Sequence, residues 1–425
     1  MNIKLKRIFA LLLIAVFQTV FIQAQVTTDI DGLMKNAKVK NAFEFIKQIE
    51  PETVEEQIKI AEIPAPTFEE QKRGEYFRKR FAEIGLKNVR VDGVGNVIGE
   101  RAGTGGKDAP TLVLAAHLDT VFAMDTLLKT VRTGTVIKLP GIGDDARGLT
   151  LLLAIARTLE KHNIETVGNI IFVANVAEEG LGDLKGVRHL FNEELKGKIT
   201  HFISIDGTGL GVTTGAVGSK RYRVTFSGPG GHSYGAFGMA NPIHAVGRLI
   251  AKISEFQTPL EPKTTFSVGV IRGGTSVNSI AAEASFDLDM RSVDPKELEK
   301  LDKLFKLNAR AALDEENARW KDQGKLTLDV KLIGDRPTGT QLQNSPIIKT
   351  ASSVNKFMKI EDKFAFASTD SNLPISLGIP AIMIDGGGIG KGAHSLGEQW
   401  DSTDSHLGSQ RALLIVLGIV GVSQN

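Results

Sequence analysis

The 425-residue chain contains no cysteine, and this absence removes several kinds of site. Disulfides, thiolate nucleophiles, Cys-ligated zinc and iron–sulfur clusters all require cysteine sulfur. Any metal ion bound by this protein must therefore be held by His, Asp and Glu side chains.

The chain also lacks a surplus of charge of either sign. Its 51 basic residues nearly balance its 49 acidic residues, and three of the basic residues (Lys4, Lys6 and Arg7) lie close to the N-terminus. Nucleic acids and anionic membranes attract proteins with a basic surplus, so we expect neither as a partner. The apolar fraction of 42% is typical of a packed globular protein.

Residues 1–24 have the layout of a secretory signal peptide. A basic segment, Lys4–Arg7, precedes an apolar run, Ile8–Phe17, and Ala24 offers a small residue before a cleavage point. An uncleaved membrane anchor is the alternative, although the run is short for a bilayer span. We expect an exported protein, periplasmic or extracellular, with no membrane span after signal removal. The apolar run Leu413–Val420 is also too short to span and is predicted to be a buried helix.

The rest of the chain is predicted to form an α/β domain with a mostly parallel sheet. Short apolar runs alternate with helical periodicity, which is typical of strands buried on both faces of a sheet by helices. The predicted strands are 111–116, 169–176, 202–205 and 381–384, and the predicted helices include 41–60, 69–84 and 146–162.

A second domain interrupts this pattern between residues 218 and 335. Here alternating segments such as 220–226 and 284–290 are interspersed with two helical segments, which favours a small α+β domain. We therefore predict a catalytic domain formed by residues 25–217 and 336–425, with an insert at 218–335.

Acidic and histidine side chains follow the predicted strands. They are His117 and Asp119, the pair Asp144-Asp145 before a helix, the pair Glu178-Glu179, Asp206 and His394. Each of these has an ordinary structural explanation on its own. Because functional groups gather at the carboxyl ends of strands in open α/β sheets, we expect them to lie together.

Two His and several carboxylates, without Cys, match zinc, cobalt or manganese. Five ligand positions exceed the needs of one catalytic zinc ion. They suit two metal ions about 3.5–4 Å apart that share a bridging carboxylate. One glutamate beside a ligand glutamate then remains free to act as a general base.

With this order of residues, the sequence resembles the M20 family of co-catalytic metallopeptidases, near its peptidase T and carboxypeptidase G2-like branches. The resemblance covers nearly the whole chain after the leader and includes the insert, with Gly230-Gly231-His232-Ser233 near its start. The M28-type aminopeptidases have a similar order of ligands but lack the insert. The chain departs from the M20 pattern at Ala146-Arg147-Gly148, because the family commonly has Lys after the two acids.

The resemblance implies a role for each of these residues. Asp144 bridges two divalent ions, most simply Zn²⁺, with Co²⁺ or Mn²⁺ as alternatives. His117 and Asp206 complete one site, and Glu179 and His394 complete the other. Asp119 orients His117, and Glu178 is the general base.

The resemblance also implies a homodimer formed through the insert. His232 would reach the partner's active site and donate a hydrogen bond to the oxyanion. Asn278 and Arg291 match insert motifs that contact substrate in relatives. A His that stabilises its own turn and a surface ion pair are the alternative interpretations of His232 and Arg291.

The sequence therefore predicts a secreted two-metal exopeptidase that hydrolyses amide bonds of short peptides with metal-activated water and a Glu base. An N-acyl-amino-acid amidase or deacylase with the same chemistry is the first alternative. A metal-binding or peptide-binding module without turnover is the second, and the presence of Glu178 disfavours it.

We predict that the mature protein begins near Gln25, because the basic start, the apolar run and Ala24 fit processing at this point. N-terminal sequencing of protein from the native host tests this. Recovery of Met1 in a membrane fraction would support the anchor instead.

Overall fold

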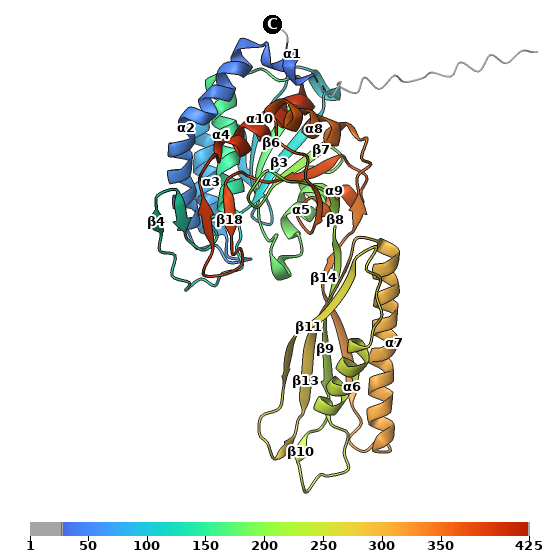
Figure 1. Ribbon diagram of the computed structural model, residues 1–425. Helices are drawn as coiled ribbons and strands as arrows, with labels where there is room; N and C mark the ends of the chain where they lie inside the picture. Colours follow the sequence, from blue (N-terminus) through green and yellow to red (C-terminus); the bar gives the residue numbers. More distant parts are fainter. Residues whose placement is uncertain (1–26, 28, 424–425) are drawn as a thin grey trace, which may run out of the picture.

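The computed structural model describes residue 27 and residues 29–423, so the predicted signal peptide lies outside the described residues. The described chain forms a thick α/β domain from which an elongated insert projects (Figure 1). None of the helices in the described part combines the length and apolar character needed to cross a membrane.

A nine-stranded sheet organises the larger domain. Its spatial order is β1 (Lys87–Val91), β2 (Val97–Arg101), β6 (Asn169–Asn175), β3 (Thr111–His117), β7 (His201–Ile205), β17 (Ala381–Ile384), β8 (Val212–Ala216) and β15 (Gly339–Thr340), with β16 (Phe364–Ala367) beside β8. The central strands β6, β3, β7 and β17 are parallel, whereas β1, β2 and β15 pair antiparallel at the edges. The predicted mostly parallel α/β sheet is therefore confirmed.

Helices cover both faces of this sheet because its central strands are apolar on both sides. In β3, Leu112 and Leu114 pack on one face, and Val113 and Ala115 pack on the other. The first face carries α2 (Ala37–Ala61), α3 (Gln71–Ile84), α4 (Ala146–Lys161), α8 (Pro346–Met358) and α10 (His406–Val420). The second carries α5 (Lys185–His189), a π-helical turn at Leu190–Glu194, and α9 (Asn372–Ser376).

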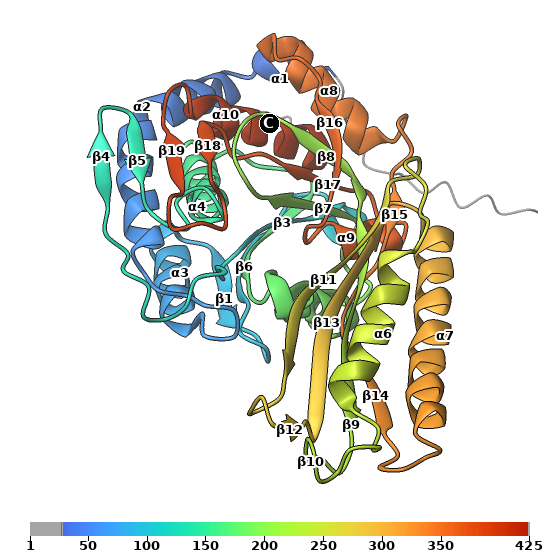
Figure 2. The same cartoon turned by 60° about the horizontal axis from the view of Figure 1, so that its bottom comes forward.

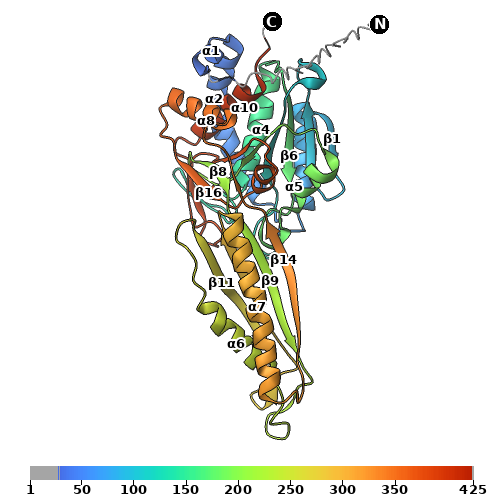
Figure 3. The same ribbon diagram turned by 90° about the vertical axis from the view of Figure 1, so that its right-hand side faces the viewer.

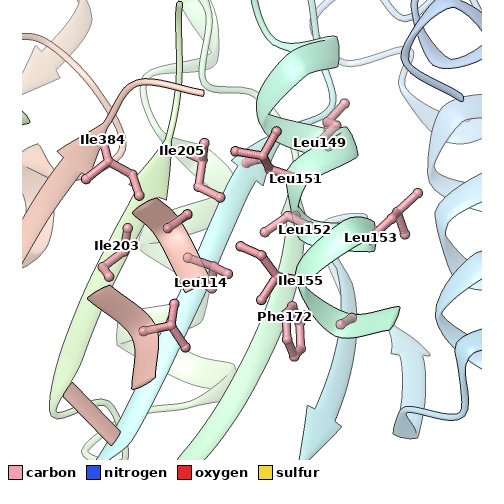
Figure 4. Close-up of a cluster of buried hydrophobic side chains, with 14 of the residues drawn as sticks. Leu114, Leu149, Leu151, Leu152, Leu153, Ile155, Phe172, Ile203, Ile205 and Ile384 are labelled. Atoms are coloured by element: carbon pink, nitrogen blue, oxygen red, sulfur yellow. The ribbon is translucent and has the colours of Figure 1, made fainter. Parts of the chain in front are cut away.

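Helix α4 lies at the centre of the first face (Figure 4). Leu152 and Ile155 of this helix pack beside Leu114 and Phe172 of the sheet. The start of α4 comes very close to the end of β7, where a Cβ atom at Gly148 would lie 2.5 Å from the carbonyl oxygen of Ile205. Glycine at this position therefore allows the helix N-terminus to reach the carboxyl edge of the sheet.

The insert has its own four-stranded antiparallel sheet with two helices on one face (Figures 2 and 3). The strands, in spatial order, are β11 (Thr264–Gly273), β13 (Glu283–Ser292), β9 (Gly218–Ser227) and β14 (Thr327–Arg336), and the helices are α6 (Pro242–Ser254) and α7 (Pro295–Arg319). Alternation fixes the faces: Tyr222, Val224 and Phe226 of β9 pack under the helices, whereas Arg221 and Arg223 face away and pair with acids of β13.

The chain enters and leaves the insert at neighbouring points. Strands β8 and β15, which precede and follow it, pair through Ala216 and Gly339. The side-chain amide of Asn372 donates to the carbonyl oxygens of both crossing segments, at 2.9 Å for Val217 and 3.0 Å for Pro337. The two crossing segments are therefore held together on the catalytic side.

Several elements were not among the individual predictions. They are the edge strands β1 and β2, strand β11, helices α1 (Ile30–Met34), α8 and α9, and a small sheet of β18 (Ile389–Lys391), β19 (Gln399–Asp401), β5 (Val136–Lys138) and β4 (Val131–Thr133). These segments are short or carry mixed patterns, so their pairing depends on contacts distant in sequence.

Candidate metal centre

The parallel strands deliver the proposed ligands to one edge of the large sheet. His117 is the last residue of β3, Asp206 directly follows β7, and Glu179 lies a few residues beyond β6. Asp144 lies just before α4, and His394 belongs to the loop between β18 and β19. His117, Asp206 and Glu179 converge as expected of groups that follow neighbouring parallel strands. Asp144 and His394 reach the same edge from loops.

Three overlapping groups of ligand-type atoms form at this edge, and one of them joins His117 to Glu178 and Glu179. The other two share Asp144. His117, Asp144 and Asp206 make one group, and Asp144, Glu179 and His394 make the other, each with ligand atoms within 4.8 Å of one another. His117 Nε2 lies 3.1 Å from Asp144 Oδ1, and His394 Nε2 lies 2.9 Å from Asp144 Oδ2. Asp144 therefore faces both groups with one oxygen each.

The charges in this cluster perturb each other. Burial, together with the charge of Asp144, raises the pKa of Asp206 to about 7. Hydrogen bonds to Asp144 and Glu179 raise the pKa of His394 to about 10. The Oδ1 of Asp144 is buried, and its 3.1 Å contact with His117 Nε2 lacks the geometry of a hydrogen bond. A donor set of two imidazoles and clustered carboxylates, with such an oxygen at its centre, fits two divalent cations.

Asp119 contacts both His117 and the backbone of the Glu178-Glu179 pair. The ring of His117 contacts Asp119 through Nδ1, which lies 3.0 Å from the carbonyl oxygen and 3.5 Å from Oδ1 of the carboxylate. The carboxylate itself accepts the backbone N–H groups of Glu178 and Glu179 at 3.0 and 2.9 Å. Asp119 therefore fixes the backbone of the glutamate pair as well as the ring of His117.

Glu178 faces a different partner from that of its neighbour Glu179. Its Oε1 accepts a 2.9 Å hydrogen bond from Arg336 Nη1, and both side chains are buried. Burial raises the pKa of Glu178 well above its usual range, whereas the charge of Arg336 lowers it. Arg336 was not among the predicted site residues, because no motif linked the end of the insert to position 178.

Glu398 is a second site residue that the sequence did not reveal. It is buried, and its carboxylate accepts the backbone N–H groups of Gly141 (2.6 Å), Gly143 (2.9 Å) and Asp144 (3.1 Å). It follows His394 in the same loop, so it joins the loop that carries Asp144 to the loop that carries His394. Burial raises the pKa of Glu398 to about 7, although the three N–H donors lower it.

The predicted insert residues do not reach this cluster within one chain. His232 and Asn278 lie at the tip of the insert, where β10 (Gly231–His232) pairs with β12 (Ser279–Ile280), far from the catalytic domain (Figures 1 and 2). His232 Nδ1 accepts N–H groups from its own turn at 3.3 Å. Arg291 lies at the opposite end of the insert sheet, paired with Asp289 at 2.7 Å.

Comparisons with known proteins agree with this arrangement. The sequence model of the peptidase dimerisation domain matches residues 214–317, and that of peptidase family M28 matches residues 96–228. The chain is 27% identical over 252 residues to IAA-amino acid hydrolase ILR1-like 5 of Arabidopsis thaliana, which covers 57% of each chain. It is 25% identical over 229 residues to carboxypeptidase G2 of Pseudomonas sp. (strain RS-16), which covers 51% of this chain and 54% of that protein. The matches thus span little more than half the length of these relatives.

Solved structures share the fold over a greater length. Aminopeptidase PepT of Bacillus cereus superposes with a TM-score of 0.69 at 19% identity, covering 87% of this chain and 98% of that one. The YXEP protein of Bacillus subtilis, described as a dinuclear metal-binding peptidase from the M20 family, superposes with a TM-score of 0.62 at 16% identity, covering 89% and 100%.

The fold is a two-domain α/β architecture with an insert that matches a peptidase dimerisation domain, and the clustered side chains are those of a candidate metal centre. These matches support the resemblance to the M20 family of metallopeptidases that the sequence predicted. The dimerisation-domain match favours M20 over the M28-type alternative, although the first part of the catalytic domain also matches the M28 model.

We expect Glu398→Gln to weaken the affinity for a divalent ion such as zinc by about 10- to 100-fold, the usual effect of losing a residue that supports ligands. Glutamine offers one acceptor oxygen to three N–H donors, so the Asp144 loop loses part of its anchor. Competition with a chromophoric chelator measures the affinity. Glu361→Gln, at an exposed position, is the matched control. Unchanged zinc affinity in Glu398→Gln would show that the loops hold their spacing without this carboxylate.

Proposed function

We propose that this protein is an exported two-metal exopeptidase that hydrolyses amide bonds in short peptides. The observation that carries the proposal is the convergence of His117, Asp144, Glu179, Asp206 and His394, with Glu178 beside them. It is supported by the names of the proteins that this chain is similar to, which include an aminopeptidase and a carboxypeptidase.

Each residue has a distinct task in this proposal. His117 and Asp206 would hold one ion, Glu179 and His394 would hold the other, and Asp144 would serve both. When bound, the two ions supply Lewis-acid polarisation of the scissile carbonyl and lower the pKa of water. Glu178 takes a proton from the water that attacks the carbonyl carbon. It returns that proton to the amine nitrogen as the carbon–nitrogen bond breaks.

An N-acyl-amino-acid amidase is the second candidate function. It uses the same residues and differs only in the part of the substrate beyond the scissile amide. The similarity to a protein named as an IAA-amino acid hydrolase supports it. We rank a binding module without turnover below both, because Glu178 is present and lies beside the proposed ligands.

A hydrolysis screen separates these candidates. The probes are Leu-Gly, Leu-Gly-Gly, their forms blocked at either end, and N-acetyl-leucine, each tested with zinc, cobalt and manganese. A requirement for a free amine identifies an aminopeptidase, and a requirement for a free carboxylate identifies a carboxypeptidase or deacylase. Absence of turnover with every probe and metal would contradict the proposal.

The insert supplies the second part of the proposal, a homodimer in which His232 acts on the partner's substrate. The match to a peptidase dimerisation domain supports the dimer, and the distance of the insert tip from its own metal centre supports action on the partner. In that position His232 donates a hydrogen bond to the oxyanion formed during attack, and Asn278, beside it at the tip, contacts the substrate.

We expect Glu178→Gln to lower kcat by about 10²–10⁴-fold with near-normal metal content, because only the proton acceptor is removed. Glu179→Gln should instead lose one metal equivalent, since Glu179 lies 3.0 Å from His394 in the second group. Metal analysis beside steady-state kinetics distinguishes the two. Loss of a metal equivalent in Glu178→Gln, but not in Glu179→Gln, would reverse the assignments.

Mixed dimers test the role of His232. We expect His117→Ala and His232→Ala subunits to be inactive separately and to recover activity on mixing. One of the two sites in a mixed dimer then has an intact metal centre and receives His232 from the other chain. A tag on one variant verifies subunit exchange. Verified exchange without recovery would contradict donation between subunits.

A further inference from the structure

The insert contacts the catalytic domain at the segment that carries the proposed base. Arg221 of β9 donates to the carbonyl oxygen of Gly180 at 2.6 Å. The backbone N–H of Asp335, in β14, donates to Asp183 Oδ1 at 2.9 Å, and Arg188 donates to the carbonyl oxygen of Asp335. All of these contacts fall on residues 178–188, which begin with Glu178.

Arg336 makes the most direct of these contacts. Its Nη1 donates to Glu178 Oε1 at 2.9 Å and to Ser368 Oγ at 3.1 Å, and its Nη2 donates to the carbonyl oxygen of Glu178. The guanidinium thus holds the side chain and the backbone of Glu178 at once. The side chains are only 5% and 6% exposed, so neither charge can exchange this partner for water.

The position of Arg336 in the chain links this contact to the insert. Arg336 is the last residue of β14 and pairs with Ser219 at the start of β9. The next residue, Pro337, belongs to the crossing that Asn372 holds on the catalytic side. Arg336 is therefore the point at which the insert sheet ends, and any rotation of that sheet about the crossing moves the guanidinium relative to Glu178.

We propose that Arg336 is a positioning residue that holds the Glu178 carboxylate beside the metal centre and ties its placement to the orientation of the insert. This rests on the proposed role of Glu178 as the base. The competing interpretation is that Arg336 binds a substrate carboxylate. The geometry disfavours it, because both Nη atoms are engaged by Glu178 and the side chain is buried.

Kinetics of Arg336→Gln and Arg336→Lys test the proposal on whichever probe of the screen the wild type hydrolyses. We expect Arg336→Gln to lower kcat by about 100-fold, the scale of a misplaced catalytic group. KM should stay within about twofold and metal content should not change, because the substrate and the ions are held elsewhere. Lysine keeps the charge and should recover about tenfold of the loss.

A double variant decides whether Arg336 acts through Glu178. If it does, Arg336→Gln added to Glu178→Gln lowers kcat no further than Glu178→Gln alone. Arg223→Gln is the matched control, because Arg223 lies on the same insert sheet and pairs with Asp287 at 2.8 Å, away from the site. Additive losses, or a raised KM with kcat preserved, would overturn the proposal, and the latter would favour substrate binding.

Amide hydrogen exchange tests, without any substrate, whether Arg336 anchors residues 178–188 to the insert. We expect Arg336→Gln to speed amide exchange in residues 178–188 and to leave β3 unchanged, since only the former segment loses its anchor. Unchanged amide exchange in residues 178–188 would show that Arg336 does not anchor this segment to the insert, even if the kinetics agree. If the wild type hydrolyses none of the probes, the proposed function fails while this measurement still decides whether Arg336 anchors the segment.

Discussion

Crowded negative charge at the carboxyl edge of the large sheet is the constraint on which the site depends. The ends of the parallel strands and the loop before α4 place six acids close together, and most are buried: Asp119, Asp144, Asp145, Glu178, Glu179 and Asp206. Buried like charges are costly unless cations or N–H donors neutralise them. Two buried arginines contribute positive charge: Arg73 of α3 interacts electrostatically with Asp119 and Asp145, and Arg336 of β14 pairs with Glu178. Ligand-type atoms of four of these acids and of His117 and His394 lie within 4.8 Å of one another in each group, and divalent ions stabilise such crowding.

The environment separates two glutamates that are neighbours in sequence. Glu178 meets a guanidinium from the insert, whereas Glu179 meets the imidazole of His394 from the catalytic domain. Asp119 holds the backbone of both. In the proposed mechanism the base, Glu178, keeps its carboxylate free of the metal, and the ligand, Glu179, directs its carboxylate at the metal. The two partners provide this difference, which the residue type alone cannot supply.

The sequence predicted the fold class, and its proposed ligands do converge, because both depend on short-range patterns. Apolar runs mark buried strands, and polar residues such as His117 and Asp206 directly follow them. Arg336 and Glu398 escaped prediction because they meet their partners across 158 and more than 250 residues of chain. No sequence motif links these residues to their partners. An arginine or glutamate near the end of a strand or loop is usually an exposed surface residue, so its position alone does not indicate a site. Strand β11 was missed for a related reason: it is an edge strand with a largely exposed second half.

The antiparallel pairing of β8 with β15 also bears on how such a protein can be assembled from parts. Ala216 and Gly339 are already hydrogen-bonded neighbours on either side of the insert, and Asn372 closes the gap between the two crossings. Strands β8 and β15 therefore pair as the two strands of a β-hairpin do, and the insert takes the place of the loop that would connect them. A domain attached in this way can be lengthened, replaced or removed through evolution without a change in the order of the strands that carry the metal centre. Such an exchange would alter the contacts of the insert with residues 178–188, among them the contact of Arg336 with Glu178.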